Sequence, residues 1–589
     1  MDTPKHPSPQ SPEIDVIVVG SGAAAMSAAI TAHLEGLSVL MLEKTAHIGG
    51  STAISGGAIW VPFNDQTEKV GHPDSEAKVW EYLHNVLGEI PNRPQMQAYL
   101  DRGAQALRYL EQHDALRLLG RVYSPDYYPD RSGASMGGRA LDPAEFDARE
   151  LGGKFPELRN PLPEFTVLGG MMITLTDARH LLRVTKSFAS WKHGMKLVLR
   201  YFKDRLQGYH RGTRTLLGNA LAGRLFARVV SLGIPYRLHA EVTALLRADP
   251  QAPERVTGVE VQTPAGTEHL SARKGVLLAT GGFPWDPEMR QAHYPSPTGP
   301  YSMSPTGNSG DGIRMGREVG GVLGTGNSSP AFWAPVSVLQ RADGTALRYP
   351  HLVWDRAKPG LIAVNSAGKR FVNESTSYHE FVIGMYRSHE QVATIPAYLL
   401  CDSDFIETWG LGLALPGGRP RQHLERAGYL VKAPTLDALA GQLGMDGNVL
   451  KETIARYNLH AVQGRDPDFG KGSTAYNQYL GDPDHQPNAC LAPLQKGPFY
   501  AVRVYPGDIG TALGLQADAH ARALNAQGAP IPGLYVAGND QNSVMGGAYP
   551  GPGITLGPAL TFGWIAAMHM AHPEAEQCAS SPQPTRRPE

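Results

Sequence analysis

The stretch that decides the fold is Asp15-Val-Ile-Val-Val-Gly20-Ser-Gly22-Ala-Ala-Ala25-Met-Ser-Ala-Ala-Ile30. An apolar run enters a G-x-G-x-x-A turn, and an alanine-rich run follows. Gly20 permits the tight turn, Gly22 lets the backbone approach a pyrophosphate, and Ala25 lets the helix pack closely on the strand. The helix N-terminus offers free N–H groups and the positive end of a dipole, which favour an anion. The stretch therefore predicts a strand–turn–helix unit that binds a dinucleotide.

Further elements favour FAD over NAD as that dinucleotide. The strand-like run 39–42 ends at Glu43, where a carboxylate would bind a ribose hydroxyl. The hydroxyl-rich loop 49–57 could line a flavin ring, and two buried strands end in the glycines of 274–283 and 533–539. The candidate cofactor-binding residues are Gly20, Gly22, Ala23, Ala24, Glu43, Lys44, Gly50, Ser51, Thr52, Ser55, Gly56, Gly57, Thr280, Gly281, Gly282, Asp311, Gly538, Asn539, Gly553 and Leu556.

The order of these elements predicts the domain organisation. A chain of 589 residues can form two or three domains. The FAD elements lie at both ends of the chain, so a second domain must be inserted between them. We predict an α/β protein whose Rossmann-like FAD-binding domain is interrupted by an α+β catalytic cap domain, with the active site at their seam. The expected ranges are 1–334 with a helical insertion at 85–225, the cap at 335–505, the second FAD-binding part at 506–572, and a disordered tail at 573–589.

Bulk properties exclude several classes of function. Lys and Arg number 54 against 55 Asp and Glu, so the charge balance indicates no nucleic-acid partner. Cys401, Cys490 and Cys578 are scattered, which excludes a disulfide framework and a metal-binding spacing and indicates a reducing compartment. Residues 1–13 lack the apolar core of a secretory signal, and no uncharged apolar run reaches the ~18 residues of a membrane span. We therefore expect a cytoplasmic protein without a metal site.

The apolar face of one predicted helix has two possible interpretations. In the segment 192–206, Met195, Val198, Leu199, Phe202 and Leu206 share one face, while Lys192, Lys196, Arg200 and Lys203 share another. A basic amphipathic helix can lie on an anionic membrane, which would place the protein at its inner face. The alternative is a surface helix that packs its apolar face on the core.

A second glycine-rich stretch supplies the candidate chemistry. It reads Gly546-Gly-Ala-Tyr549-Pro-Gly-Pro-Gly553-Ile-Thr-Leu-Gly557. So many glycines and prolines form neither a packed helix nor a strand, and they predict a loop whose amides can approach a ligand. A phenol and a free backbone N–H held close together form a clamp for a carbonyl oxygen.

These stretches together resemble the 3-ketosteroid dehydrogenases, within the fumarate reductase/succinate dehydrogenase flavoprotein superfamily. The resemblance covers nearly the whole chain. It rests on Gly49-Gly-Ser-Thr-Ala-Ile-Ser-Gly-Gly-Ala-Ile-Trp60-Val-Pro, on Gly307-Asn-Ser-Gly-Asp311-Gly-Ile-Arg314-Met, on Arg370-Phe-Val-Asn-Glu374-Ser-Thr-Ser-Tyr378, and on Gly546-Gly-Ala-Tyr549-Pro-Gly-Pro-Gly553. It implies removal of hydrogens from C1 and C2 of a 3-ketosteroid, with electrons passing through FAD to a quinone or other acceptor.

Two departures from other branches of the superfamily refine this expectation. Succinate dehydrogenases carry flavin on a histidine at about the place of Ser51, so the resemblance implies non-covalent FAD here. Fumarate reductases bind substrate with a histidine where this chain has Ile509. An apolar side chain there cannot bind a dicarboxylate, which favours an apolar substrate.

The resemblance also implies site roles. Tyr549 O–H and Gly553 N–H match the pair that holds the C3 ketone, and Tyr378 matches the tyrosine that abstracts the C2 proton. A phenol has an ordinary pKa near ~10, so it needs activation to act as a base. We expect a neighbouring tyrosine to help and favour Tyr127 over Tyr128. Phe332 and Trp354 are candidate steroid-packing aromatics, but for each of them the sequence favours a place in the structural core.

Three other functions stay open. The same scaffold could desaturate C4–C5 of a 5α-3-ketosteroid, or reduce a small enoate as fumarate reductases do. A flavin-binding protein that docks on membranes without catalysis is the fourth possibility. Retention of both Tyr378 and Tyr549 speaks against the last, and Ile509 speaks against the enoate reductase.

Overall fold

The computed structural model describes residues 13–573 except 183, 186, 248–250 and 253. The expected tail therefore lies outside the described residues, apart from Pro573. The predicted nucleotide unit forms β1 (Val16–Val19), α1 (Ala23–Leu34) and β2 (Val39–Leu42). These open a six-stranded sheet of order β10-β2-β1-β14-β22-β21, parallel except at β21. Its other strands are β10 (Tyr236–Arg237), β14 (Gly275–Leu278), β21 (Arg522–Leu524) and β22 (Pro530–Val536).

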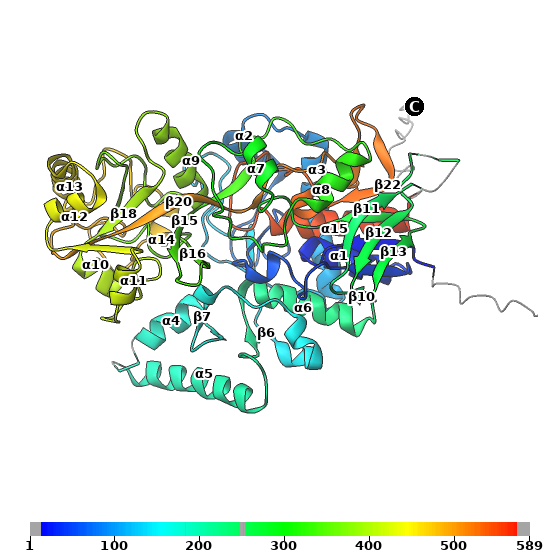
Figure 1. The fold of residues 1–589 in the computed structure, drawn as a ribbon, viewed down its shortest axis with the longest axis horizontal. Coiled ribbons are helices and arrows are strands. Elements are labelled where there is room, and N and C mark those ends of the chain that lie inside the picture. Colours follow the sequence, from blue (N-terminus) through cyan, green and yellow to red (C-terminus); the bar gives the residue numbers. More distant parts are fainter. Residues whose placement is uncertain (1–12, 183, 186, 248–250, 253, 574–589) are drawn as a thin grey trace, which may run out of the picture.

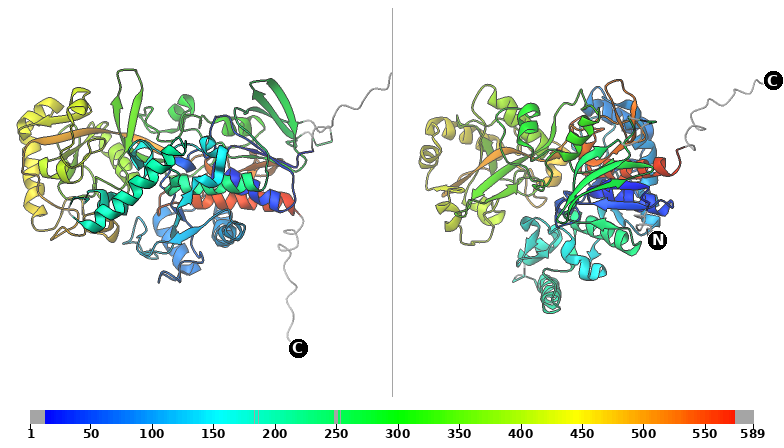
Figure 2. Two further views of the ribbon diagram at one scale, coloured as in Figure 1. Left: turned by 90° about the horizontal axis from the view of Figure 1, so that it is seen from below. Right: turned by 45° about the vertical axis from the view of Figure 1, so that its right-hand side comes forward.

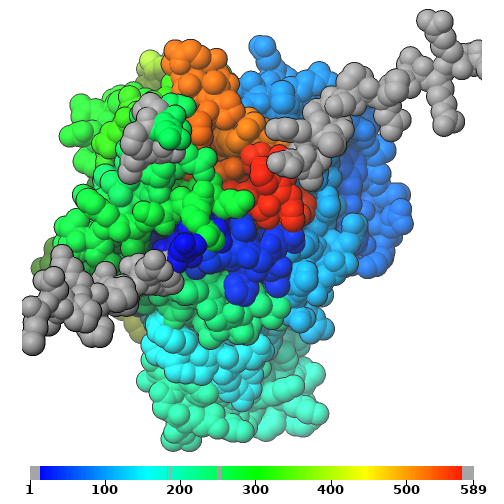
Figure 3. All heavy atoms as spheres, turned by 90° about the vertical axis from the view of Figure 1, so that its right-hand side faces the viewer, coloured from blue at the N-terminus to red at the C-terminus, as the bar shows by residue number. Residues whose placement is uncertain are grey.

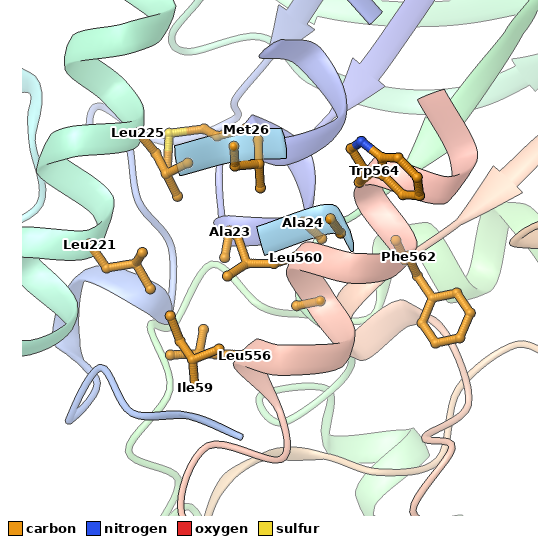
Figure 4. Packing of buried hydrophobic residues seen from close by; sticks show 14 of the residues in the cluster. Ala23, Ala24, Met26, Ile59, Leu221, Leu225, Leu556, Leu560, Phe562 and Trp564 are labelled. Carbon is orange, nitrogen blue, oxygen red and sulfur yellow. The ribbon is translucent and has the colours of Figure 1, made fainter. Parts of the chain in front are cut away.

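Small residues let three helices pack closely against one another beside this sheet. α1 is buried along nearly its whole length and packs on both α6 (Leu217–Ser231) and α15 (Leu556–Ala571). Figure 4 shows the alanines of α1 between leucines of α6 and the larger side chains of α15. α15 comes from the end of the chain, so the two FAD-binding parts form one core although more than five hundred residues separate them.

A second sheet carries the cap. Its order is β16-β15-β20-β18-β17, with β19 also paired to β20. The strands are β15 (Ala331–Gln340), β16 (Ala346–Pro350), β17 (Leu361–Val364), β18 (Ala397–Cys401), β19 (Leu430–Ala433) and β20 (Phe499–Thr511). The helices are α9 (Tyr378–His389), α10 (Ser403–Thr408), α11 (Gln422–Arg426), α12 (Leu436–Leu443), α13 (Gly447–Ala461) and α14 (Ala475–Leu480).

The long strands β15 and β20 run from the centre of the molecule into the cap (Figure 1). The expected borders at 334/335 and 505/506 therefore fall inside these two strands. The division into domains stays a proposal, and the continuous strands explain how a cap of this kind can be held firmly against the FAD-binding part.

The region expected to be a helical insertion also contains short strands. Its helices are α3 (Arg93–Gln112), α4 (Leu175–Leu182) and α5 (Phe188–Leu206), and α2 (Glu76–Leu87) ends just inside it. Its strands are β4 (Leu118–Gly120), β5 (Ala140–Pro143), β6 (Phe146–Asp147), β7 (Thr166–Val167), β8 (Met171–Met172) and β9 (Arg214–Thr215), and β3 (Ile59–Trp60) precedes it. α4 and α5 form a hairpin that projects from the body (Figures 1 and 2), and the same lobe extends below the sheet in the space-filling view (Figure 3).

The remaining elements complete the FAD-binding part. They are β11 (Glu241–Leu246), β12 (Gly258–Thr263), β13 (Gly266–Ser271), α7 (Pro287–His293) and α8 (Asp311–Glu318). Within the described ranges, no helix combines the length and the apolar character that crossing a membrane requires.

Candidate active site

A large cavity lies where the two sheets meet. Its volume is about 2550 Å³, well above the roughly 300–1,000 Å³ of a pocket for one small ligand. It begins at the carboxyl ends of β1, β2 and β14, where open parallel sheets bind their ligands, and extends to cap residues 347–354 and 408–416. The cavity can therefore hold a dinucleotide together with a second molecule.

Nearly all the predicted cofactor-binding residues line this cavity. The exception is Gly282, whose N–H donates to Asp540 Oδ1 at 2.8 Å behind the wall. The residues that do line it are Gly20, Gly22, Ala23, Ala24, Glu43, Lys44, Gly50, Ser51, Thr52, Ser55, Gly56, Gly57, Thr280, Gly281, Asp311, Gly538, Asn539, Gly553 and Leu556. Residues from five separate segments of the chain thus share one wall.

The backbone at this wall fits a pyrophosphate. α1 begins at Ala23, and its N-cap Gly22 has no side chain to cap it. Ala23 N–H donates to Thr52 Oγ1 at 3.0 Å, whereas the Ala24 and Ala25 N–H groups have no acceptor among the described residues. Gly20 has a φ of 112°, and a Cβ there would lie 2.2 Å from the carbonyl oxygen of Ala279. Only glycine therefore lets β1 turn into α1 so close to β14. Free N–H groups at a helix end, beside a wall without side chains, are what a phosphate anion requires.

The two charged residues after β2 have different surroundings. Glu43 accepts hydrogen bonds from Ser21 Oγ at 2.5 Å and from Thr45 N–H at 2.9 Å. A carboxylate has about four lone-pair sites, so Glu43 can still accept a ribose hydroxyl. Lys44 is paired with Asp311 and donates to Ser309 Oγ at 2.7 Å. Its charge is therefore balanced by the protein itself.

Tyrosines from distant parts of the chain meet on the wall of the same cavity. Tyr127, Tyr378 and Tyr549 all line it. Tyr127 O–H donates to Tyr378 Oη at 3.0 Å, and its ring stacks on that of Tyr549 with centroids 5.4 Å apart. The Tyr378 ring meets Tyr549 edge-on at 5.2 Å. Tyr128 instead turns its hydroxyl to Glu380 Oε1 at 2.6 Å, so the two neighbouring tyrosines have different partners.

Local structure fixes the first two tyrosines. Tyr378 is the first residue of α9, whose N-cap Ser377 accepts from Glu380 N–H at 3.2 Å. Tyr127 lies in a loop, where its N–H donates to Pro550 O at 2.9 Å. The preceding Asp126 is paired with Arg139 at 2.8 Å, and both side chains are buried. The loop that carries Tyr127 is thereby tied directly to the loop that carries Tyr549.

The Tyr549 loop also presents an open amide. Gly553 has a φ of 100°, and a Cβ there would lie 2.4 Å from the Ala58 carbonyl. Its carbonyl accepts hydrogen bonds from Trp60 N–H and Gly557 N–H, whereas its own N–H has no acceptor among the described residues. A buried N–H without a partner is rare and costly unless a ligand satisfies it.

Burial governs the acidity of the cluster. Desolvation raises the pKa of Tyr549 to about 12, and it raises the pKa of Tyr127 and Tyr378 as well. Tyr549 is therefore neutral at ordinary pH and keeps a proton to donate. A base at Tyr378 needs positive charge nearby to offset the cost of desolvation.

The two predicted aromatic contacts differ. Trp354 is half-buried, lines the cavity and donates from Nε1 to Trp409 O at 2.9 Å. Phe332 is buried and packs edge-on against Tyr549 at 5.4 Å, and it is absent from the described lining of the cavity. Ile509 does line the cavity, so an apolar side chain occupies that position on the wall.

Two histidines of the cap are buried. His379 is 1% exposed, and its Nδ1 accepts from Trp333 N–H at 3.1 Å. Desolvation lowers its pKa to about 3. A Ser–His–Asp chain, which sequence spacing did not suggest, joins Ser337 Oγ to His351 Nε2 at 2.7 Å and His351 Nδ1 to Asp355 Oδ2 at 2.6 Å. All three side chains are fully buried and cannot reach a substrate, so this hydrogen-bonded triad is structural.

Sequence reasoning missed two buried residues beside the tyrosines. Tyr476 is the second residue of α14, and the centroid of its ring lies 4.6 Å from that of Tyr127. Arg356 lies behind the cap wall of the cavity. The only sequence signal at Tyr476 is the helix cap Thr474, which marks a helix start and no function. Within the described ranges, no group of three His, Cys, Asp or Glu side chains could hold a metal ion.

Comparison with known proteins agrees with this geometry. Residues 15–556 match the model of the FAD binding domain family. A 3-oxosteroid 1-dehydrogenase of Mycolicibacterium smegmatis is 36% identical over 95% of this chain and 97% of its own. The chain belongs to the FAD-dependent 3-ketosteroid dehydrogenase family. As members of that family do, it binds FAD and is an oxidoreductase.

Two further relatives bear on the substrate. The crystal structure of a 3-ketosteroid Δ1-dehydrogenase from Sterolibacterium denitrificans, in complex with 1,4-androstadiene-3,17-dione, superposes with a TM-score of 0.89. It is 37% identical and covers 96% of this chain and 100% of its own. A 4-oxocyclohex-2-ene-1-carboxylate 5-dehydrogenase of Sinomonas cyclohexanicum is 38% identical over 95% of this chain and 93% of its own. Family members thus act on cyclic ketones of very different size.

Proposed function

We propose that the protein desaturates C1–C2 of a 3-ketosteroid. The observation that carries this proposal is the meeting of Tyr127, Tyr378 and Tyr549 with the open Gly553 amide on one cavity wall. Tyr549 O–H and Gly553 N–H would hold the C3 oxygen and stabilise the enolate as its charge develops. Tyr378 would take the C2 proton, and Tyr127 would donate a hydrogen bond to the phenolate that results.

When bound, FAD supplies the acceptor for the hydride that leaves C1, at its N5 atom. The α1 N-terminus and the loop 49–57 would hold the dinucleotide on the same cavity wall that carries the tyrosines. We propose that the binding is non-covalent, since Ser51 on the cavity wall offers no histidine-like nucleophile. Acid precipitation should then leave all the flavin in the supernatant. We further propose a quinone as the acceptor that reoxidises it.

A one-ring oxo-carboxylate is the second candidate substrate, because a relative is named for that activity. The cavity wall favours the steroid. Beyond the tyrosines it continues along Leu352, Trp354, Leu413 and Leu415, which offer apolar surface to several rings. Arg121, a cation on this wall that acts electrostatically on Tyr127, is already bonded to Asp142 at 2.6 Å. A substrate carboxylate would have to compete with Asp142 for that guanidinium.

The test compares the two substrates by anaerobic flavin reduction. We expect kcat/KM for androst-4-ene-3,17-dione to exceed that for 4-oxocyclohexanecarboxylate by about a hundredfold or more, since burying three further rings gains several kcal/mol. The reverse order would identify the one-ring ketone as the substrate. Reduction by neither compound would reject the proposed function.

We also propose that α5 rests on an anionic membrane. The structure does not pack its apolar face on the core: Leu199, Phe202 and Leu206 are 60%, 53% and 88% exposed. The face turned inward instead carries Ser190, Gly194, Tyr201 and Asp204. Val198 of the same helix lines the cavity, so the exposed face adjoins the route to the site. An apolar substrate could then pass from the bilayer to the cavity.

Co-sedimentation with phosphatidylglycerol vesicles at low salt tests this contact. We expect the wild type to sediment and Phe202→Asp to bind about tenfold less, because one large apolar side chain contributes roughly 1.5–3 kcal/mol when buried. Leu459→Asp is the matched control, since Leu459 is equally exposed but lies on the cap helix α13. Absence of the wild type from the pellet would contradict the proposal that α5 binds an anionic membrane.

A further inference from the structure

One arginine connects the cavity wall to the turn before Tyr378. The Arg356 side chain is 2% exposed, and all its hydrogen bonds go to backbone carbonyls. Nε donates to His351 O at 2.6 Å and Nη2 to Leu352 O at 2.9 Å. Nη1 donates to Glu374 O at 2.8 Å and to Thr376 O at 3.1 Å. A planar guanidinium with donors on several sides is the side chain that can hold two segments in this way.

The two segments are the parts of the cap that define the site. Leu352 lies on the cavity wall, and the stretch 374–376 leads into Ser377 and Tyr378 at the start of α9. The position of the Tyr378 hydroxyl relative to the wall therefore depends on this guanidinium. A displacement of about 1 Å at a reacting group can cost on the order of a hundredfold in rate.

The charge of Arg356 is not cancelled by a contacting carboxylate. Within the described residues Arg356 forms no ion pair. The Asp355 carboxylate accepts from His351 Nδ1 and from two backbone N–H groups. The Glu374 carboxylate is held bidentately by Arg370. A buried arginine with only neutral carbonyl partners keeps a positive potential around it, because little water screens its charge.

That potential reaches the tyrosine cluster. Burial lowers the pKa of Arg356, and negative charge on Tyr476, Asp355, Glu374 and Tyr378 opposes the shift. The coupling is reciprocal, so a charged Arg356 also favours the ionised form of Tyr378. The N-terminus of α9 adds a positive dipole end at the same residue.

Several other groups face Tyr378. Tyr127 bonds to its hydroxyl, and Tyr549 and Tyr476 are neutral phenols in the same cluster. Arg121 acts on Tyr127 from the other side, but its charge is paired with Asp142. Glu380, on the first turn of α9, is bonded to Tyr128, and His379 is neutral. Among these groups Arg356 is the buried cation without a paired carboxylate.

We propose that Arg356 is a positioning residue for the proton-abstracting tyrosine. It fixes the turn that carries Tyr378 and directs at the cluster a positive charge that no carboxylate contacts. This inference rests on the proposed function, because it requires Tyr378 to act as the base. It assigns to Arg356 the activation that a buried phenol needs.

The test is the pH dependence of anaerobic flavin reduction by androst-4-ene-3,17-dione in Arg356→Gln and Arg356→Lys. Loss of the charge raises the pKa of the base, so the acid limb of Arg356→Gln should move to higher pH by about one unit or more. Arg356→Lys keeps the charge but loses the planar guanidinium that donates to both segments at once. Its rate should fall while its acid limb stays close to that of the wild type.

A merely structural role predicts a different outcome. Both variants would then lose rate equally at every pH with unchanged acid limbs, and that result would overturn the proposal. If Arg356→Gln fails to retain FAD, tyrosinate absorbance near 295 nm decides, measured on the cofactor-free wild type and on cofactor-free Arg356→Gln, each minus the same protein with Tyr378→Phe. The proposal expects the Tyr378 titration to lie at higher pH in Arg356→Gln than in the wild type, and an unmoved titration contradicts the proposal. A wild type that no steroid reduces would instead reject the proposed function.

Discussion

Tyr378→Phe should lower the rate of flavin reduction by the steroid by about a hundredfold to ten-thousandfold, the range that a positioned general base contributes. The substitution removes one oxygen and keeps the ring, so the edge-on contact with Tyr549 should survive. FAD absorbance should be unchanged, because Tyr378 is not among the predicted cofactor-binding residues. Anaerobic stopped-flow absorbance at the flavin band measures both quantities.

Tyr128→Phe is the matched control for this substitution. Tyr128 is the sequence neighbour of Tyr127, but its hydroxyl is bonded to Glu380 and it is absent from the described cavity lining. We expect its rate to stay within a few-fold of the wild type, as is usual for a hydroxyl that contacts no reacting atom. A Tyr378→Phe enzyme as fast as the Tyr128→Phe enzyme would mean that another group takes the proton.

Tyr549→Phe should lower kcat by about a hundredfold to a thousandfold, as loss of one oxyanion-hole donor does. Burial keeps the pKa of Tyr549 at about 12, so the hydroxyl carries its proton throughout the working range and can donate it. The enolate oxygen is more negative than the ketone oxygen. The donor is therefore worth more in the transition state than in the bound substrate, and kcat should fall more than KM rises.

The matching measurement for Tyr549→Phe separates binding from catalysis. Steady-state kinetics with androst-4-ene-3,17-dione give kcat and KM, and the flavin spectrum checks that the cofactor stays bound. A rise in KM with unchanged kcat would show that Tyr549 only binds substrate. Full activity would refute the carbonyl clamp and leave the Gly553 amide without its expected partner.

The FAD-binding part could be predicted because its signals are local. Gly20, Gly22 and Ala25 lie within one turn and one helix start, and each glycine has a steric reason that sequence alone reveals. The cavity at the seam followed from the order of the glycine-rich elements along the chain. Chain order, however, does not say which strands continue across the seam, and so β15 and β20 cross the expected borders.

The tyrosine cluster could not be predicted from the residues alone. Tyr127 and Tyr378 are 251 positions apart, and only the resemblance to the ketosteroid family suggested that they meet. Periodicity predicted an amphipathic helix at 192–206 but could not decide what its apolar face contacts. That depends on tertiary packing, and the structure leaves the face exposed. Arg356 carries no sequence signal, because its partners are backbone carbonyls that every residue possesses.

The most direct test of the central claim is anaerobic reduction of the purified yellow protein by androst-4-ene-3,17-dione, with the product identified by mass and NMR. The account predicts bleaching of the flavin and a product two hydrogens lighter with a new C1–C2 double bond. Bleaching only by a 5α-saturated steroid, with a new C4–C5 double bond, would contradict the proposed regiochemistry. An unbleached flavin with both steroids would contradict the proposal that this cavity desaturates ketosteroids.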